Sequence, residues 1–271
     1  MDRSAGAVDT FRGGTRAARR ALNAFIENAL SSYDDDRNHP ERPGTSQLSP
    51  YLHFGHIGPR EVALAVLRSQ ADKPSMDAFI EQLIVRRELA VNFVRFNDAY
   101  DRLDGCEPWA RQTLRRHSLD RREYLYSREV LEAAATADPL WNAAQQQMLS
   151  TGWMHNYVRM YWGKKILEWG RSPGEAFETA TVLNDRYEVD GRDPNGYANI
   201  AWSIGGKHDR PWPERRVYGT IRSMSFASTR RKFDALSYIA QYGRPSDMVR
   251  FEELRGKRPS ARLNRRYSSA R

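Results

Sequence analysis

The clearest helical pattern in this chain is Trp153-Met154-His155-Asn156-Tyr157-Val158-Arg159-Met160-Tyr161-Trp162-Gly163-Lys164-Lys165-Ile166-Leu167-Glu168-Trp169. Trp162, Ile166 and Trp169 fall on one face, a spacing that indicates a helix packed into a core. Arg159 lies one turn before Trp162 and so faces the same interior, where a guanidinium needs a carboxylate partner. Trp141 precedes this pattern. The tryptophans are therefore either ordinary core residues or oxidisable rings that pass electrons by short hops.

The same periodicity extends to most of the sequence. Helices are predicted over residues 15–33, from Pro59 onward, and over 76–96, 109–118, 127–137, 138–150, 173–187 and 229–242. Loops are expected at 33–58, 97–108 and 188–228. The sequence has no convincing alternating strand pattern and no Asn-Gly hairpin between two strands. It therefore predicts an all-α fold with one domain.

The basic charge of the chain is concentrated near its C-terminus. The 271 residues carry a net charge of +9, yet residues 1–206 are slightly acidic, with a net charge of −2. Residues 207–232 and residues 244–271 each contribute +6. Within 207–232 the basic residues alternate with Trp212, Tyr218 and Phe226, which is typical of a surface that binds phosphates and stacks bases. Residues 244–271 are expected to form a disordered basic tail.

Several classes of protein are excluded by composition. Cys106 is the one cysteine, so neither an internal disulfide nor a thiolate metal cluster can form, which fits a reducing compartment. The six histidines are scattered, and no metal site is expected. No nucleophile motif or phosphate-binding Walker loop is present. No apolar run approaches the roughly 20 residues of a membrane span, and the N-terminus lacks the apolar segment of a secretory signal.

Two polar stretches are candidate ligand sites. In residues 37–55, Gly44, Thr45, Ser46 and Ser49 offer hydroxyls and backbone N–H groups where a loop enters a helix. That arrangement suits a phosphate or pyrophosphate, although simple helix capping would use the same residue types. Residues 183–202 hold three Asn and three Asp among glycines. This density exceeds what a solvated connector needs and favours a polar ligand site.

These motifs resemble those of a known family. The run Thr45-Ser46-Gln47-Leu48-Ser49-Pro50-Tyr51-Leu52-His53-Phe54-Gly55 resembles the flavin-binding signature of the photolyase/cryptochrome family, and residues 153–160 resemble its second signature. Residues 160–169, 187–197 and 207–212 resemble more narrowly the class II cyclobutane pyrimidine dimer photolyases. The resemblance extends from residue 10 to residue 243.

The resemblance implies a domain plan. Residues 1–14 would be an N-terminal extension, residues 15–243 a helical FAD-binding and DNA-repair domain, and residues 244–271 the basic tail. Full photolyases begin with a Rossmann-like antenna domain, which this chain is expected to lack. The expected protein is a monomer of the cytoplasm, or of the nucleus in a eukaryote, with no membrane partner.

The resemblance also implies an activity, that of a deoxyribodipyrimidine photo-lyase. Excited, fully reduced FAD would donate an electron to a UV-induced pyrimidine dimer in DNA, the cyclobutane ring would split, and the electron would return. Such chemistry needs no general acid or nucleophile. A dimer flipped out of DNA needs apolar walls and a few hydrogen-bond donors.

Site roles follow from the resemblance, residue by residue. The flavin's pyrophosphate and ribityl chain would be held by Tyr33, Thr45, Ser46, Gln47, Leu48 and Ser49. Arg159 and Asp190 would form an ion pair beside the isoalloxazine, Asn184 would face flavin N5, and Asp193 would also bind the cofactor. Photoreduction would use Trp162, nearest the flavin, with Trp141 and Trp169. The dimer would meet Arg37, Met160, Trp202 and Gln82, the last at a position where many members carry a Glu.

Two other functions remain open at this point. A cryptochrome-like photoreceptor would bind FAD and signal without repairing DNA. A DNA-binding module that no longer holds flavin would keep only the basic and aromatic surface of residues 207–232.

Overall fold

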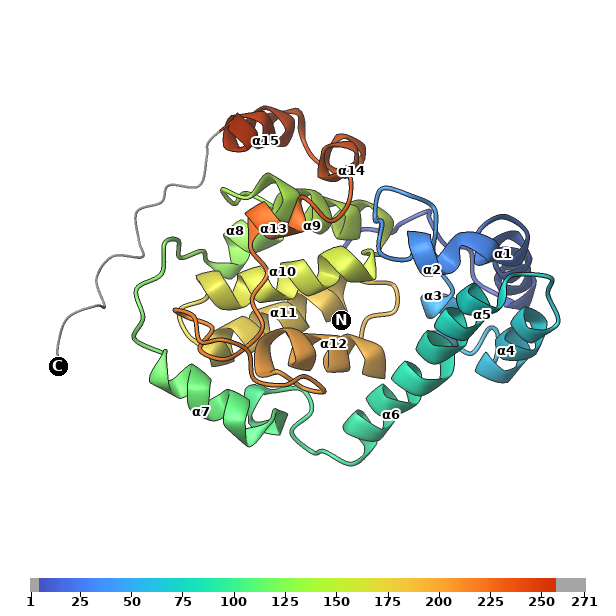
Figure 1. Cartoon of the computed structure of the whole chain (residues 1–271), viewed down its shortest axis with the longest axis horizontal. Helices are drawn as coiled ribbons and strands as arrows, with labels where there is room; N and C mark the ends of the chain where they lie inside the picture. The colour runs from blue at the N-terminus through green and yellow to red at the C-terminus, as the bar shows by residue number, and fades with distance from the viewer. Residues whose placement is uncertain (1–4, 257–271) are drawn as a thin grey trace.

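The computed structural model of this chain describes residues 5–256, which form helices joined by loops (Figure 1). Within that range the sole β feature is an isolated bridge between Arg215 and Gly219, so the predicted all-α class is confirmed. None of the described helices is long and apolar enough to cross a membrane. The first half contains α1 (Thr15–Asn28), η1 (Leu30–Ser32), α2 (Tyr33–Asp36), α3 (Ser49–His53), α4 (Pro59–Leu67), α5 (Lys73–Ile80), η2 (Glu81–Arg86), α6 (Arg87–Arg95), η3 (Leu103–Gly105), α7 (Pro108–Arg116) and α8 (Arg128–Glu132).

The second half holds the longer buried helices. These are α9 (Pro139–Thr151), α10 (Asn156–Trp169), α11 (Pro173–Tyr187) and α12 (Pro194–Gly205), followed by α13 (Phe226–Thr229), α14 (Ala235–Tyr242) and α15 (Pro245–Gly256). In Figure 1, α10, α11 and α12 lie side by side at the centre, with α7 and the segment after α12 around them.

The helices enclose two hydrophobic clusters. The N-terminal cluster joins buried residues from Ala17 to Leu83, with Leu22, Phe25 and Phe79 among them. The C-terminal cluster joins buried residues from Phe93 to Phe251 and contains all of the expected relay tryptophans. In Figure 1 the first cluster belongs to the blue and teal helices on the right, and the second to the green, yellow and orange helices.

A continuous rod joins the two clusters, because α5, η2 and α6 follow one another without a loop (Figure 1). The helix predicted over 76–96 is thus present, but its middle, η2, is π-helical. A π-helical turn widens the helix and occurs frequently at functional sites. Gln82 and Leu83 lie within this turn.

Side-chain caps fix where the central helices begin. The His155 ring accepts a hydrogen bond from Tyr157 N at the start of α10. Asp193 Oδ1 accepts one from Asn195 N at 2.9 Å and starts α12. Ser172 caps α11 in the same way. These caps satisfy N–H groups that a helix end would leave unpaired.

Several predicted boundaries are wrong. The helix expected over 15–33 ends at Asn28, because the chain turns at Ala29 (φ −136°) and buries both Leu30 and Tyr33. The loop expected over 188–228 contains the twelve-residue α12. Pro194 directly after the capping Asp193 is a helix-start signal that could have revealed it.

The basic tail expected to be disordered from residue 244 begins instead with α15. Phe251 is buried there and packs edge-on against Phe226, with 5.9 Å between ring centroids. Asp247 accepts a hydrogen bond from Asn142 of α9. Apolar burial therefore orders this part of the tail, whereas residues 257–271 lie outside the described residues.

Candidate functional site: a cavity between the two clusters

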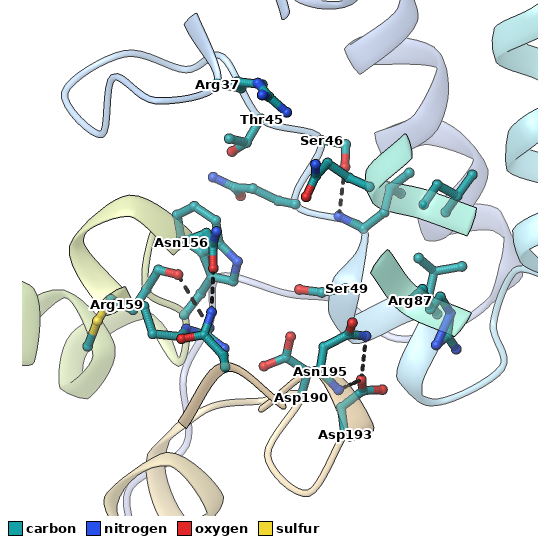
Figure 2. Close-up of a pocket in the computed structure, with 18 of the residues that line it drawn as sticks. Arg37, Thr45, Ser46, Ser49, Arg87, Asn156, Arg159, Asp190, Asp193 and Asn195 are labelled. Atoms are coloured by element: carbon teal, nitrogen blue, oxygen red, sulfur yellow. Dashed lines mark hydrogen bonds between the residues drawn. The ribbon is translucent and has the colours of Figure 1, made fainter. Parts of the chain in front are cut away.

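A cavity of about 390 Å³ opens where the two hydrophobic clusters meet. Its volume falls in the range of small-molecule sites. Figure 2 shows Thr45 and Ser46 on one side of it and Arg159, Asp190 and Asn195 across from them. The residues expected to touch FAD or the dimer that line it are Tyr33, Arg37, Thr45, Ser46, Gln47, Leu48, Ser49, Gln82, Arg159, Asp190 and Asp193.

The hydroxyl-bearing wall is a tightly packed loop before α3. A Cβ on Gly44 would come within 2.6 Å of Asp36 Cβ, so only glycine lets the loop lie this close to α2. Gln47 adopts a positive φ of 50°, which turns the chain between Ser46 and α3. Leu48 N donates to Ser46 Oγ at 3.4 Å. The loop therefore presents Thr45, Ser46 and Ser49 toward the cavity.

A histidine links the two walls. His53, at the end of α3, places Nδ1 3.1 Å from Asp193 Oδ2. The other carboxylate oxygen of Asp193 accepts from Asn195 N and from the Asn195 side chain. Asp193 thus lines the cavity mainly as the residue that positions α12, and its carboxylate is already hydrogen-bonded within the protein.

The ion pair of Arg159 differs from the one expected. Arg159 Nη2 lies 2.9 Å from Glu188 Oε1, and the predicted pairing with Asp190 is not present as an ion pair. Burial alone would lower the pKa of Arg159, but the nearby carboxylates of Glu188, Asp190 and Asp193 together raise it. Glu188 directly follows α11 and reaches Arg159, whereas Asp190, two residues farther along the loop, raises the pKa of Arg159 without an ion-pair contact.

Three polar atoms of the cavity wall are buried without any hydrogen-bond partner: Arg37 Nε, Arg159 Nε and Asp190 Oδ1. Buried polar atoms of this kind are rare unless a ligand or water completes them. The cavity also has apolar wall from Leu48 and Phe79. The cavity combines hydroxyl groups, positively and negatively charged side chains, and apolar faces. A dinucleotide with phosphates, a sugar and aromatic rings needs these groups, so the residues present fit FAD.

Asn184 does not line the cavity. It is buried in α11 behind Gly196, where a Cβ would lie 2.9 Å from Asn184 Nδ2. Its Nδ2 donates to Asp185 Oδ1 at 3.1 Å. Because Gly196 itself lines the cavity, Asn184 stands one residue layer back from the surface that a ligand would touch.

Met160 and Trp202 likewise fall outside the cavity lining. Trp202 is half-buried in α12, and Lys164 Nζ lies 4.3 Å from its ring centroid. The same ammonium donates to the Trp202 carbonyl at 3.2 Å, and burial lowers the pKa of Lys164 to about 7. Trp202 is held by this contact one helical turn beyond Asn199, which does line the cavity.

The three expected relay tryptophans form one contiguous stack inside the C-terminal cluster. Trp162 and Trp141 are parallel with 6.3 Å between centroids, and Trp141 meets Trp169 edge-on at 5.6 Å. Trp162 Nε1 donates to Gln145, and Trp141 Nε1 donates to the Trp162 carbonyl. The order along the stack is therefore Trp162, Trp141, Trp169. Their electron-transfer role stays a prediction.

The basic segment 207–232 contributes no residue to the cavity lining. It packs along α7, where Thr220 N donates to Thr113 Oγ1, and beside the C-terminal end of α12. Arg222 makes two hydrogen bonds to Asp209 and stacks over Trp212 at 4.0 Å. Its role in DNA binding stays a prediction.

Sequence reasoning assigned no role to half of the cavity wall. Phe79 and Leu83 lie within the helix predicted over 76–96 and read as apolar positions, and nothing in the sequence marks Arg87 beyond its charge. Asn195 and Asn199 belong to the polar stretch 183–202, and Asn156 belongs to the helical pattern 153–169. The unassigned lining residues are Asn38, Leu52, Phe79, Leu83, Arg87, Trp153, Met154, Asn156, Asn195, Gly196 and Asn199.

No protein-family model matches the chain. Three relatives named deoxyribodipyrimidine photo-lyase are similar to it. The protein of Oryza sativa subsp. japonica is 51% identical over 239 residues, covering 86% of this chain and 47% of the relative. That of Potorous tridactylus is 47% identical, covering 88% and 45%, and that of Methanothermobacter thermautotrophicus is 49% identical, covering 84% and 50%. The chain thus spans about half the length of these curated relatives.

Solved structures show the same fold at lower identity. A class III photolyase of Agrobacterium tumefaciens superposes with a TM-score of 0.65 at 24% identity, covering 86% of this chain and 45% of that one. A cryptochrome of Synechocystis sp. PCC6803 gives 0.66 at 17% identity, covering 87% and 46%. The chain thus shares its fold with about half of each of these photolyase and cryptochrome structures.

Proposed function

We propose that this chain binds FAD in the cavity between its two clusters and uses it for light-driven splitting of cyclobutane pyrimidine dimers in DNA, as a class II photolyase. The observation that carries the proposal is that candidate site residues far apart in the sequence come together in one place. Residues from Tyr33 to Asp193, assigned to cofactor or substrate by separate motifs, line one cavity. Relatives at about half identity that are named photo-lyases favour the same activity.

Each wall has a distinct task in holding the cofactor. Thr45, Ser46 and Ser49 would donate hydroxyl and backbone hydrogen bonds to the pyrophosphate. Arg159 would supply positive charge where its unpaired Nε meets the cavity. Bound FAD supplies the photoexcited electron donor; the protein's part is to hold it and to keep water from the apolar wall.

The tryptophan stack would deliver the electron that activates the cofactor. Contacts of 5.6 and 6.3 Å between neighbouring rings allow short hops from Trp169 through Trp141 to Trp162. Each hop oxidises one ring as it reduces the next, and the hole left on Trp169 is filled by an external thiol. All three rings of the stack are buried, so they are protected from competing reactions with solvent.

Substrate recognition would fall to residues at the cavity rim. Arg37 and Gln82 both line the cavity, and the Gln82 amide can donate and accept at the base edges without carrying charge. The basic segment 207–232 would bind phosphates and make DNA affinity fall with added salt. Met160 and Trp202 would join this set only if the dimer reaches beyond the cavity.

The test begins with the absorption spectrum of the purified full chain, before and after blue light with a thiol present. Bound flavin that bleaches under light, together with repair of thymine dimers in an oligonucleotide, would establish the function. Trp162→Phe should slow photoreduction but leave repair by chemically reduced protein intact. A chain that never binds flavin would contradict the proposal and leave the DNA-binding module as the remaining candidate.

A cryptochrome-like photoreceptor is the second candidate, favoured by the fold match to the Synechocystis cryptochrome. It would use the same cavity and the same stack. Retained FAD that photoreduces normally, with dimers left intact, would distinguish it from a photolyase.

A further inference from the structure

The wall of the cavity contains a cluster with more buried acid than base. Arg159 from α10 contacts Glu188 at 2.9 Å, and Asp190 follows two residues later in the same loop. The Glu188 side chain is 1% exposed and that of Arg159 is 13% exposed. One guanidinium therefore faces two carboxyl groups in a place that water barely reaches.

The hydrogen bonding of this cluster is incomplete. Asp190 Oδ1 and Arg159 Nε are buried without a hydrogen-bond partner, whereas the Glu188 carboxyl is contacted by Arg159 and by the backbone N–H of Met154. Arg159 Nη2 is shared with the Met154 carbonyl at 3.3 Å. A fully ionised buried pair is normally held by aligned, charge-assisted hydrogen bonds. Arg159 Nη2 is instead divided between the Glu188 carboxyl and the Met154 carbonyl.

No other group compensates the extra negative charge. On the α10 side, His155 is neutral because burial lowers its pKa to about 4. From α14, Tyr238 faces the cluster with its pKa raised by burial, so it is neutral as well. Asp193 adds acid, with His53 beside it. An uncompensated buried carboxylate is neutralised by binding a proton, and burial raises the pKa of Glu188 to about 8.

We propose that Glu188 exchanges a proton with solvent behind the cavity wall, and that negative charge developing in the cavity completes its protonation, which frees Arg159 to face that charge. The proton binds a Glu188 oxygen, and no bond to the cofactor forms. This inference rests on the proposed function only for the source of the charge, which is reduction of bound FAD by an external thiol under light.

A first test needs no flavin. Glu188 has a folded pKa above its unfolded value of about 4.3, so the folded protein binds the extra proton and is stabilised as pH falls between about 8 and 5. Within that window, each unit by which the pH falls should reduce the equilibrium constant for unfolding of the full chain by up to about tenfold. Glu188→Gln should remove this component, whereas Glu178→Gln, on the exposed face of α11, should keep it.

A second test uses infrared difference spectra of the FAD-loaded protein upon photoreduction at pH 8. The wild type should gain the carbonyl band of a protonated carboxyl, because the raised pKa of Glu188 leaves part of these carboxyl groups ionised at pH 8 before reduction. The band should shrink at pH 6.5, where the proton is already bound, and vanish in Glu188→Gln.

Three outcomes would overturn the inference. One is a wild type that gains no carbonyl band although its FAD is reduced. Another is a band that survives Glu188→Gln and disappears in Asp190→Asn, which would move the proton to Asp190. The third is an unchanged pH dependence of unfolding in Glu188→Gln. Failure to bind FAD would instead contradict the proposed function and leave the flavin-free test of Glu188 valid.

Discussion

The two walls of the cavity differ in how they are built. The wall from the N-terminal cluster is a loop with hydroxyls and a π-helical turn, whose groups are mostly neutral. The wall from the C-terminal cluster is formed by helix starts and carries the side chains of Arg159 and Asp190, with Glu188 buried behind them. One wall offers mainly hydrogen-bonding groups, and the other carries buried ionisable groups.

The cavity also lies along the junction between the two hydrophobic clusters. Each cluster buries its own apolar residues, and the two share the rod of α5, η2 and α6 and the contact between His53 and Asp193. Unpartnered polar atoms remain along the junction. A ligand that completes them would stabilise the folded chain by about 2.7 kcal/mol at a hundred times its dissociation constant.

The largest effect is expected from breaking the charged wall. Arg159→Met leaves Asp190 and Glu188 buried without a cation, which should lower the free energy of unfolding by about 3–5 kcal/mol. Urea unfolding followed by circular dichroism measures this change. Arg171→Met, an exposed arginine just after α10, is the control and should change stability little. An equal loss of stability in both variants would mean that the buried Arg159 contributes no more to the free energy of unfolding than an exposed arginine does.

A smaller loss should separate the two clusters. Phe79→Ala in the N-terminal cluster should destabilise the chain by about 3 kcal/mol, at the low end for such changes because its site already opens into the cavity. It should also reduce the gain in melting temperature that FAD gives. Phe177→Ala, in the C-terminal cluster and away from the cavity, should keep that gain in full. The comparison fails if both variants respond to FAD alike.

Each hydroxyl of the loop before α3 should contribute a smaller free energy, and this contribution is to FAD binding. Ser46→Ala removes one hydroxyl hydrogen bond and should weaken FAD binding by about 1 kcal/mol, roughly fivefold in dissociation constant. A titration followed by flavin fluorescence measures it. Ser150→Ala, on the outer face of α9, provides the matched control. Unaltered affinity in Ser46→Ala would show that the hydroxyls face the cavity without meeting the ligand.

The smallest effect lies far from both walls. His117 contacts Asp120 at 2.7 Å and Glu214 at 2.9 Å, and hydrogen bonds to Glu214 and Asp120 raise its pKa. A raised histidine pKa stabilises the fold fully below about pH 6.5, and this stabilisation is lost as pH rises through the folded pKa. His117→Gln should therefore reduce the change in the urea midpoint of unfolding between pH 6 and pH 9, and it should leave FAD affinity unchanged. A changed FAD affinity would link this surface contact to the cavity.

Much of the architecture could be predicted from local pattern. The helix that carries Trp162 and Trp169 begins within a few residues of its predicted start, and α11 matches its prediction at both ends. The hydroxyls around Ser46 were identified as a ligand site and do line the cavity. In contrast, α12 was not predicted, because Asn195 and Gly196 are poor helix formers and obscure the start signal of Asp193 and Pro194.

The sequence by itself determined the all-α class, the buried faces of the long helices and the polar motifs, because helical periodicity and turn chemistry act over a few residues. The tertiary structure alone decided that Arg159 meets Glu188 rather than Asp190, and that Asn184 stands behind Gly196. Those outcomes depend on how α10, α11 and α12 pack against one another, because that packing decides which of two buried carboxylates comes within ion-pair distance of Arg159.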